Sequence, residues 1–396
     1  MNTFPTVLRI LWAAALLATA SPSAPGQGPA APKPPRTPRM LPLTKFYDTP
    51  DPLPAGKPGE LIRSQPFGEY YLPYDVLAVR ILYHSRSSSG EDVAVSGVVL
   101  LPDGARPAGG WPVMAWAHDF TGSARQCAPS LLRNLNEGPL LSMYVGLGHA
   151  MVVSDYAGLG TNFPNAAMDM RSNALDVINS IPAARAALPQ LGTKWVAVGY
   201  SQGGLAAIGV AEADSETGDL NYLGAIAISG VAEAQEIFER IAEGPARGLL
   251  VDLAHGIKTV FPEFRVEEML TDKAIPLYQH ISHDCEASSR TGLAANEMLK
   301  PGWKNNRYVK EFFVRNTPGW KPVHGPLLLI SGETDPEVPA DLTAPVVARL
   351  CEQKVRVLFV KYPGLNASAV LRNSVSEQIS WIQARFAGLP APSNCP

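Results

Sequence analysis

The segment Gly199-Tyr-Ser-Gln-Gly-Gly204 constrains this chain more than any other part of its sequence. Residues 193–200 before it form a short apolar run typical of a buried strand. Residues 203–212 after it have the small-residue composition of a helix packed closely on a sheet. A serine between such elements lies on a strained turn that exposes its hydroxyl. The pattern is that of a nucleophile elbow, here called the elbow, and it predicts Ser201 as a nucleophile. The alternative is a tight turn whose serine has no catalytic role.

Short apolar segments alternate with helical segments along most of the chain. The predicted strands are residues 113–117, 151–154, 194–200, 223–229, 327–331 and 355–362, and the predicted helices include 172–188, 341–351 and 374–386. This alternation indicates an α/β fold, with a mostly parallel sheet and helices on both faces. Residues 74–83 and 93–101 flank a polar turn and predict an antiparallel hairpin at a sheet edge.

One interval interrupts the alternation. Residues 231–325 contain no clear strand, and their helical stretches carry apolar clusters. An insertion after the strand that follows the elbow would lie over the pocket as a lid, and the alternative is an extra helical layer. We therefore expect a core from 59–230 and 326–396 with a helical lid at 231–325.

The N-terminus has the pattern of an exported protein. An apolar run after Arg9 ends in Ala18-Thr-Ala20, which predicts a signal peptide over residues 1–20 with cleavage after Ala20. A membrane anchor would need about 17–25 apolar residues, and this run is shorter. Residues 21–58 contain twelve prolines and predict an extended, disordered linker. We expect a secreted or periplasmic protein with no transmembrane segment in the mature chain.

Charge and cysteine usage exclude other classes. The net charge is −3 and no Lys/Arg-rich run occurs, so nucleic acid is not an expected partner. Export makes the four cysteines, at 127, 285, 351 and 395, candidates for disulfides, with three possible connectivities. No pair has the close spacing of a zinc site, and we expect no metal and no cofactor.

The residues that would assist Ser201 are only partly present. In folds with this turn, an acid and then a histidine follow the serine in the chain. Asp335 follows the predicted strand 327–331 and is the best-placed acid; Glu333 and Glu337 are second choices. The histidines are at 84, 118, 149, 255, 280, 283 and 324, so none follows Asp335.

Two backbone amides could form an oxyanion hole. The amide of Gln202 opens the predicted helix and would supply the first. The loop after strand 113–117 would supply the second, through Asp119 or Phe120. We interpret His118 as bracing this loop, with proton transfer as the less favoured alternative. Asp155 follows a strand but precedes the elbow, and we read it as a structural loop residue.

Several segments together resemble the secretory lipase family of α/β-hydrolases. They are Trp116-Ala-His-Asp-Phe-Thr-Gly122, Gln126-Cys-Ala-Pro-Ser130, Asp155-Tyr-Ala-Gly-Leu-Gly160, the elbow, Gly332-Glu-Thr-Asp335 and Tyr362-Pro-Gly-Leu365. The resemblance runs from about residue 60 to the C-terminus. It implies an α/β-hydrolase fold with a helical lid, acting on acylglycerols or simpler acyl esters, with possible lipid contact through the lid. It also implies disulfides Cys127–Cys285 and Cys351–Cys395.

The chain departs from the family pattern at two places. Asp119 and Phe120 replace small residues of the oxyanion loop, and Ala367 stands where the catalytic histidine is expected. His283, which the first disulfide would bring towards His118, is the candidate replacement base. We therefore expect an impaired serine esterase, and the alternative is a catalytically silent relative that binds a hydrophobic ligand or a partner.

Overall fold

A mixed sheet of nine strands forms the centre of the computed structural model, which describes residues 40–73, 75–213 and 221–396. The predicted signal peptide and residues 21–39 of the predicted linker lie outside the described residues. The strands are β1 (Leu61–Pro66), β2 (Val76–Arg86), β3 (Asp92–Pro102), β4 (Trp111–Ala117), β5 (Ala150–Ser154), β6 (Leu191–Tyr200), β7 (Asn221–Ile228), β8 (Leu327–Gly332) and β9 (Val357–Tyr362). Their order across the sheet is β1-β2-β3-β5-β4-β6-β7-β8-β9.

Six of these strands, β5, β4, β6, β7, β8 and β9, are mutually parallel, which confirms the predicted fold class. The hairpin β2–β3 is antiparallel as predicted, but it does not form the edge of the sheet. β1 pairs outside β2 and takes that position. The sequence of β1 gave no strand signal because its six residues are half-buried or exposed and do not alternate.

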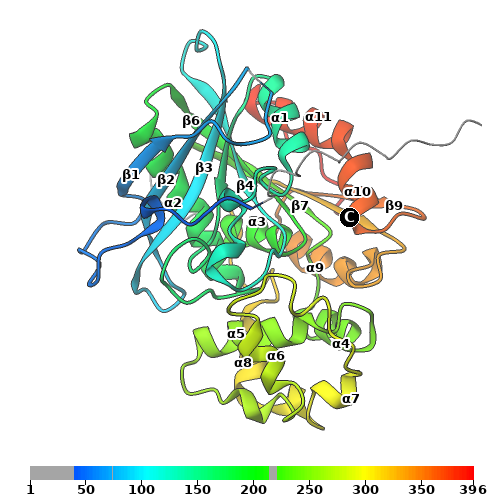
Figure 1. Cartoon of the computed structure of the whole chain (residues 1–396). Helices are drawn as coiled ribbons and strands as arrows, with labels where there is room; N and C mark the ends of the chain where they lie inside the picture. Colours follow the sequence, from blue (N-terminus) through cyan, green and yellow to red (C-terminus); the bar gives the residue numbers. More distant parts are fainter. Residues whose placement is uncertain (1–39, 74, 214–220) are drawn as a thin grey trace, which may run out of the picture. The chain divides into compact units, whose positions relative to one another are not determined.

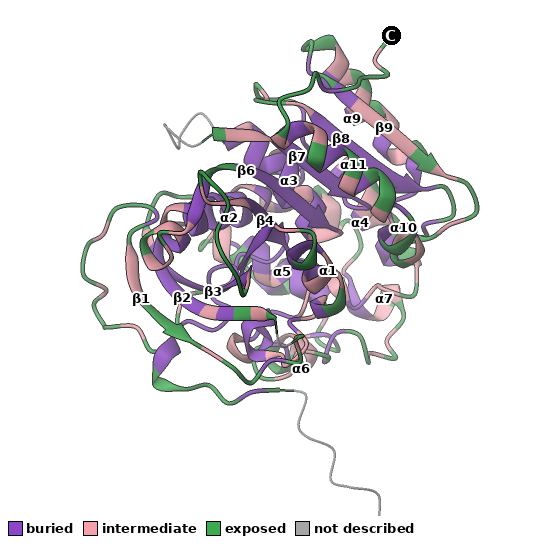
Figure 2. Cartoon of the chain, turned by 90° about the horizontal axis from the view of Figure 1, so that it is seen from above, coloured by how far each residue is buried: buried purple, intermediate pink, exposed green. Residues whose placement is uncertain are grey.

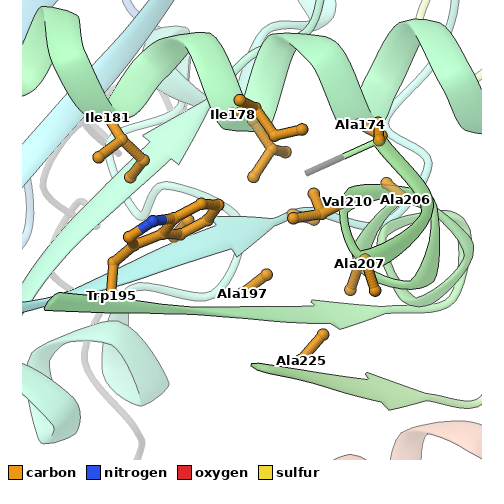
Figure 3. Close-up of a cluster of buried hydrophobic side chains, with 14 of the residues drawn as sticks. Ala174, Ile178, Ile181, Trp195, Ala197, Ala206, Ala207, Val210 and Ala225 are labelled. Carbon is orange, nitrogen blue, oxygen red and sulfur yellow. The ribbon is translucent and has the colours of Figure 1, made fainter. Parts of the chain in front are cut away.

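The sheet is buried on both faces. Neighbouring side chains of each strand point to opposite faces, and on the central strands the side chains of both faces are apolar. On β4, Val113 and Ala115 join one apolar cluster, whereas Met114 and Trp116 join another. Figure 3 shows the first cluster, in which Trp195 lies beneath Ile178 and Ile181 of α2 (Met170–Ala187). Burial follows the sheet in Figure 2, where the central strands are purple along most of their length.

Helices cover both faces of the sheet. Residues of α2, α3 (Gln202–Ala213) and α9 (Ala340–Glu352) contribute to one apolar cluster. Residues of α1 (Gly138–Gly146), α10 (Ala367–Asn373) and α11 (Val375–Phe386) contribute to the other. The short 3₁₀ helices are η1 (Lys45–Tyr47), η2 (Arg125–Cys127), η3 (Pro129–Leu131), η5 (Val266–Glu268) and η6 (Trp303–Asn305).

The interval 231–325 folds as a helical group, which Figure 1 shows gathered away from the helices that cover the sheet. It comprises α4 (Ala234–Glu243), α5 (Leu249–Val260), α6 (Ile275–His280), α7 (Ala295–Met298) and α8 (Arg307–Arg315). It has its own apolar cluster, centred on side chains such as Leu253, Phe264 and Phe312. Its extended pairing is limited to one bridge between Leu270 and Leu299 among the described residues. Its role as a lid stays a prediction.

Residues 40–58 do not behave as the predicted linker. Leu41, Phe46 and Tyr47 are buried in the core, and Met40 forms a bridge with Leu132. The Tyr47 hydroxyl bonds to Ser130. The proline content was a poor guide here because three large apolar side chains are enough to fix a short segment to a core.

Two disulfides fix distant segments of the chain. Cys127 pairs with Cys285 and Cys351 with Cys395, each with Cα atoms 5.5 Å apart, which is the pairing that the family resemblance implied. The first bond joins η2 to the helical group, and the second holds the C-terminal tail against α9. Within the described residues, no helix has the length and apolar character needed to cross a membrane.

The order of the strands determines where a site can form. The chain passes from β4 to β5 on one side of β4 and then to β6 on its other side. In a parallel sheet, ligands bind beyond the carboxyl ends of the strands at such a switch point. The carboxyl ends of β4 and β6 lead into residues 118–122 and into Ser201.

Candidate active site

Ser201 lies at the sharp turn between β6 and α3, with a φ of +55°. Its N–H donates to the Ile228 carbonyl at 2.8 Å, and its own carbonyl accepts from Gly204 at 2.8 Å. A left-handed φ is rare for a residue other than glycine and marks a strained position held by its surroundings. This is the geometry that the Gly-x-Ser-x-Gly pattern predicts for an exposed nucleophile.

Neighbouring glycines make this turn possible. A Cβ on Gly203 would lie 1.9 Å from the Ala117 carbonyl oxygen, and a Cβ on Gly230 would lie 1.9 Å from the Ser201 carbonyl oxygen. Any side chain at these positions would separate α3 from β4 or from the loop after β7. The glycines therefore bring Ser201 close to the loop that begins at His118.

Ser201 opens into a cavity of about 230 Å³ with mostly apolar walls. The core supplies one side and the helical group supplies the other, mainly through α4. The lining residues are Asp119, Phe120, Met168, Ser201, Gln202, Leu205, Ser229, Gly230, Ala234, Ile237, Phe238, Ile241, Leu249, Asn316, Glu337 and Val338. Such a pocket suits the apolar part of a small molecule, with Ser201 and Asp119 as polar groups that fix its orientation.

The carboxyl group of Asp119 accepts hydrogen bonds from the backbone amides that were predicted to form the oxyanion hole. Its carboxyl accepts from the Phe120 N–H at 2.6 Å and also interacts with the Ser201 hydroxyl and the Gln202 N–H. Burial raises the pKa of Asp119, and these three hydrogen bonds lower it by less. The carboxyl of Asp119, rather than its backbone amide, therefore contacts Ser201 and the Gln202 amide.

Asp335 is placed by the turn that follows β8 and is only 3% exposed. Its Oδ1 accepts from the Glu337 and Val338 amides, each at 3.0 Å. Its Oδ2 is buried and has no hydrogen-bond partner among the described residues. An acid that orients an imidazole uses one oxygen for that purpose. Oδ2 is therefore free to accept an N–H that the described residues do not supply.

Ala367 begins α10, and the segment before it contacts the Asp335 turn. The Thr334 N–H donates to the Leu365 carbonyl at 3.2 Å, and Asn366 caps the helix by accepting from the Ala369 N–H at 3.0 Å. Ala367 is half-buried. The residue at the expected histidine position thus lies on a segment that is hydrogen-bonded to the turn of the acid.

The environment of Ser201 is strongly acidic. The charges of Asp119, Asp335, Glu137 and Glu337 all raise the pKa of Tyr200, after the larger effect of its burial. Burial also raises the pKa of Glu337, with further contributions from Asp335 and Asp119. Sequence reasoning named Glu337 only as a substitute acid and missed Glu137. No motif marks Glu137, which precedes α1 and reaches the site only through the fold.

His118 is fully buried and stacks on Tyr156, with ring centroids 4.2 Å apart. Its Nδ1 lies 2.5 Å from the Asp119 carbonyl oxygen and its Nε2 lies 3.2 Å from the Asp155 carbonyl oxygen. Burial lowers its pKa to about 4, so the ring is neutral at physiological pH. A neutral ring has one N–H, so it donates to one of these two backbone carbonyls. Its burial and its contacts with backbone favour a loop-bracing role, which stays a prediction.

His283 does not reach the pocket. Its side chain is exposed, and its carbonyl accepts from the Gln126 amide nitrogen at 2.6 Å. The predicted disulfide brings this segment to the core without turning His283 towards Ser201. No histidine occurs among the described residues that line the pocket.

Asp155 has the structural surroundings expected of a loop residue. It is fully buried, accepts from the Ser130 N–H at 2.8 Å and from the Ser96 hydroxyl at 2.6 Å, and also bonds to the Ser130 hydroxyl. Burial raises its pKa. Both of its oxygens are used inside the core.

The helical group is joined to the oxyanion loop by polar contacts as well as by a disulfide. The Ser123 hydroxyl donates at 2.7 Å to Asp252 of α5, and burial raises the pKa of Asp252 to about 6. Together with Cys127–Cys285, this contact ties the loop that contains Asp119 to the helices that line the pocket. Within the described ranges, no group of three His, Cys, Asp or Glu side chains could hold a metal ion.

Comparison with known proteins identifies the family and the fold. The profile of the secretory lipase family matches residues 136–394, whereas no curated protein matches the chain.

Among solved structures, lipase A of Candida antarctica in its closed state has a TM-score of 0.77 at 19% identity, covering 90% of this chain and 91% of that one. The rice cell wall degrading esterase LipA of Xanthomonas oryzae has a TM-score of 0.66 at 20% identity, covering 84% and 98%. A hydrolase of Legionella pneumophila described as putative has a TM-score of 0.73 at 19% identity, covering 82% and 98%. At 19–20% identity, the likeness to these structures shows a shared fold only.

Proposed function

We propose that this chain, which belongs to the secretory lipase family, hydrolyses carboxylic esters through an acyl-enzyme on Ser201, and that it does so slowly. The observation that carries the proposal is the strained position of Ser201 at the mouth of an apolar pocket. The Ser201 oxygen attacks the ester carbon, the alcohol leaves, and water then releases the carboxylic acid. Acylglycerols or simpler acyl esters are the proposed substrates.

Asp119 serves this reaction in its protonated form. A carboxylate in the oxyanion position would repel the developing negative charge, whereas a neutral carboxyl can donate a hydrogen bond to it. An apolar site can keep an aspartic acid neutral for this purpose. The raised pKa of Asp119 favours that state. The Gln202 N–H, which donates to the Asp119 carboxyl in this structure, supplies the second hydrogen bond once the oxyanion displaces that carboxyl.

The slow rate follows from the missing base. An imidazole normally takes the serine proton and returns it to the leaving group. Without one at position 367, that proton passes to water, and the serine is a weak nucleophile. Asp335 remains as the acid of an incomplete triad. An oxyanion hole and substrate binding alone can leave roughly 10³–10⁴-fold catalysis over water.

The helical group over the pocket is proposed as the lid. Its helices α4 and α5 supply five of the lining residues, Ala234, Ile237, Phe238, Ile241 and Leu249, so access to Ser201 depends on their position. A lid of this kind would also make transient contact with lipid surfaces. Export follows from the predicted signal peptide, and an oxidising compartment agrees with the two disulfides.

Hydrolysis of p-nitrophenyl butyrate tests the proposal. Activity should be detectable for the wild type and should fall to the rate of buffer alone for Ser201→Ala. Ser229→Ala is the matched control, because Ser229 lines the same pocket and its hydroxyl has no hydrogen-bond partner among the described residues. Equal activity of Ser201→Ala and wild type would reject the acyl-serine route.

A second candidate is a silent relative that binds an apolar ligand in the same pocket. The observation that favours it is Asp119, whose carboxyl accepts from the Gln202 amide and contacts the Ser201 hydroxyl, while no histidine is among the described residues that line the pocket. Absence of turnover on short and medium esters, together with calorimetric binding of butyrate esters, would support this candidate instead.

A further inference from the structure

The side of the Ser201 pocket that the helical group forms is apolar. Asn316, at the end of α8, is the polar member among its lining residues. Both ends of the Asn316 amide are already used, because its Oδ1 accepts from the Met170 N–H at 2.6 Å and its Nδ2 donates to the Phe312 carbonyl at 2.8 Å. The other members are Ala234, Ile237, Phe238, Ile241 and Leu249. This wall therefore suits a hydrocarbon chain, since a polar group there would lose its hydrogen bonds to water.

Phe238 is held firmly in this wall. Its ring stacks on Phe313 of α8 with centroids 5.6 Å apart, and Phe313 meets the ring of Trp303 edge-on at 6.0 Å. Phe238 and Phe313 are both buried. The start of α4 is fixed to the core, because Glu233 pairs with Arg349 of α9. A ring supported in this way gives the pocket a fixed boundary on the side opposite the core.

The volume of the pocket sets the length of chain that it can hold. In another protein, a buried apolar cavity of about 150 Å³ binds one benzene molecule, which corresponds to about 25 Å³ for each carbon. At the same packing, the cavity of about 230 Å³ beside Ser201 holds about nine carbons. The ester carbonyl, which lies at Ser201, takes part of this space. A chain of about eight carbons fills the pocket.

The order of the reaction decides which arm of an ester can occupy this space. The acyl arm stays attached to Ser201 after the alcohol leaves, and water must then reach the same carbon. An alcohol held between Ser201 and the wall of α4 would be trapped behind the acyl group. The acyl chain is therefore the arm that fits the pocket, and the alcohol points away from α4.

We propose that the Ser201 pocket binds medium-length acyl chains, with a limit of about eight carbons that is set by Phe238. Esters of octanoic acid are the preferred substrates, and longer chains meet the Phe238 ring. This inference rests on the proposed function for the position of the ester, but the binding of a chain in the pocket does not require turnover.

Hydrolysis of p-nitrophenyl butyrate, octanoate and palmitate measures this limit, with each ester kept below the concentration at which it aggregates. Burial of each further CH₂ strengthens binding about fourfold, so kcat/KM should rise about tenfold or more from butyrate to octanoate. It should fall about tenfold or more from octanoate to palmitate, because half of the longer chain finds no room. Equal kcat/KM for the three esters, or the highest value for palmitate, would overturn the proposal.

Phe238→Ala should move the optimum from octanoate to dodecanoate, since the space of the lost ring admits about four more carbons at the same packing. Phe261→Ala is the matched control. Phe261 belongs to the same helical group and packs on Tyr308, but it is not among the described residues that line the pocket. Its optimum should stay at octanoate. An equal shift in Phe261→Ala would overturn the role of Phe238.

Ile237→Phe changes the same wall in the opposite direction. It adds a ring to the pocket and keeps the stack of Phe238 on Phe313, so it tests the limit even if Phe238→Ala does not fold. We expect its optimum to move to esters shorter than octanoate. An optimum that stays at octanoate in folded Ile237→Phe would contradict a limit set by this wall.

Binding to the Ser201→Ala protein separates this inference from the proposed function. Calorimetry with methyl butyrate, methyl hexanoate and methyl octanoate should show an affinity that rises about fourfold for each CH₂. Affinity that is independent of chain length would overturn the inference. Hydrolysis of every p-nitrophenyl ester at one rate would reject this inference and leave the proposed function standing. Length-dependent binding without any hydrolysis by the wild type would reject the proposed function and leave the chain site standing.

Discussion

The turn that contains Ser201 and the start of α10 are the expected positions of the nucleophile and the base of one catalytic site. The fold constrains the first region much more tightly than the second. Around Ser201, Cβ atoms on Gly199, Gly203 or Gly230 would each lie 1.9 Å from a backbone carbonyl oxygen. At the start of α10, Ala367 is half-buried and its neighbour Ser368 is exposed. A side chain at any of the three glycines near Ser201 would break the packing of β4, β6 and α3. A substitution at Ala367 or Ser368 should cost little stability.

The largest effect is expected from Gly203→Ala. Its Cβ would meet the carbonyl oxygens of Ala117 and His118, which are backbone atoms that cannot give way without moving β4. We expect a loss of about 3–5 kcal/mol in the free energy of unfolding, measured by urea denaturation. Gly138→Ala, in α1, is the control, because a Cβ there meets no atom within 4 Å. A loss below 1 kcal/mol for Gly203→Ala would contradict the tight packing of this turn.

Ala367→His tests the base end. If Asp335 Oδ2 accepts the new imidazole, kcat/KM for p-nitrophenyl butyrate should rise about 10²-fold, within the usual 10²–10⁴ of general acid–base assistance. The gain should disappear in Ala367→His combined with Asp335→Asn. Ser368→His places the same ring one residue further on and should give no gain. Fast turnover by the wild type, abolished by His283→Ala, would mean that a base is already present.

The pH dependence tests Asp119. Its folded-state pKa is raised by burial, so the protonated form persists to a higher pH than for a free aspartic acid. Activity that needs this proton is present below the raised pKa and falls about tenfold per pH unit as pH rises through it. The same sign holds for stability, because a group with a raised folded-state pKa favours the folded state at low pH.

Asp119→Asn should separate these effects, since its amide donates without titrating. We expect the alkaline fall in kcat/KM to disappear in this variant while activity at low pH changes by less than about tenfold. Complete loss of activity at every pH would indicate that Asp119 acts as a carboxylate, for example as a base for Ser201.

The smallest effect is expected from the cap of α10. Asn366 accepts the Ala369 N–H at 3.0 Å, so Asn366→Ala should cost about 1 kcal/mol in unfolding free energy. Asn366→Asp retains an accepting oxygen and should cost little. A loss as large as that of Gly203→Ala would remove the contrast between the two regions.

The sequence alone predicted the strand–turn–helix around Ser201, the six parallel strands and the position of Asp335 just after β8, whereas the role of Asp335 as an acid stays a prediction. These features depend on short patterns, namely apolar runs, glycines and turn residues, whose meaning is local. The edge strand β1 and the packing of residues 40–58 were missed for the same reason. Their residues give no periodic signal and are fixed by contacts with distant strands.

The contents of the site were decided by the tertiary structure. The sequence named Asp119 for a backbone amide, whereas the fold directs its carboxyl onto the Gln202 amide and the Ser201 hydroxyl. Glu137 and Glu337 reach the site from different elements, and α4 supplies much of the apolar wall. A pattern in the sequence fixes where a backbone turns. Which buried group accepts a given hydrogen bond, and at what pKa, depends on side chains brought together from distant parts of the chain, because desolvation and charge act through space.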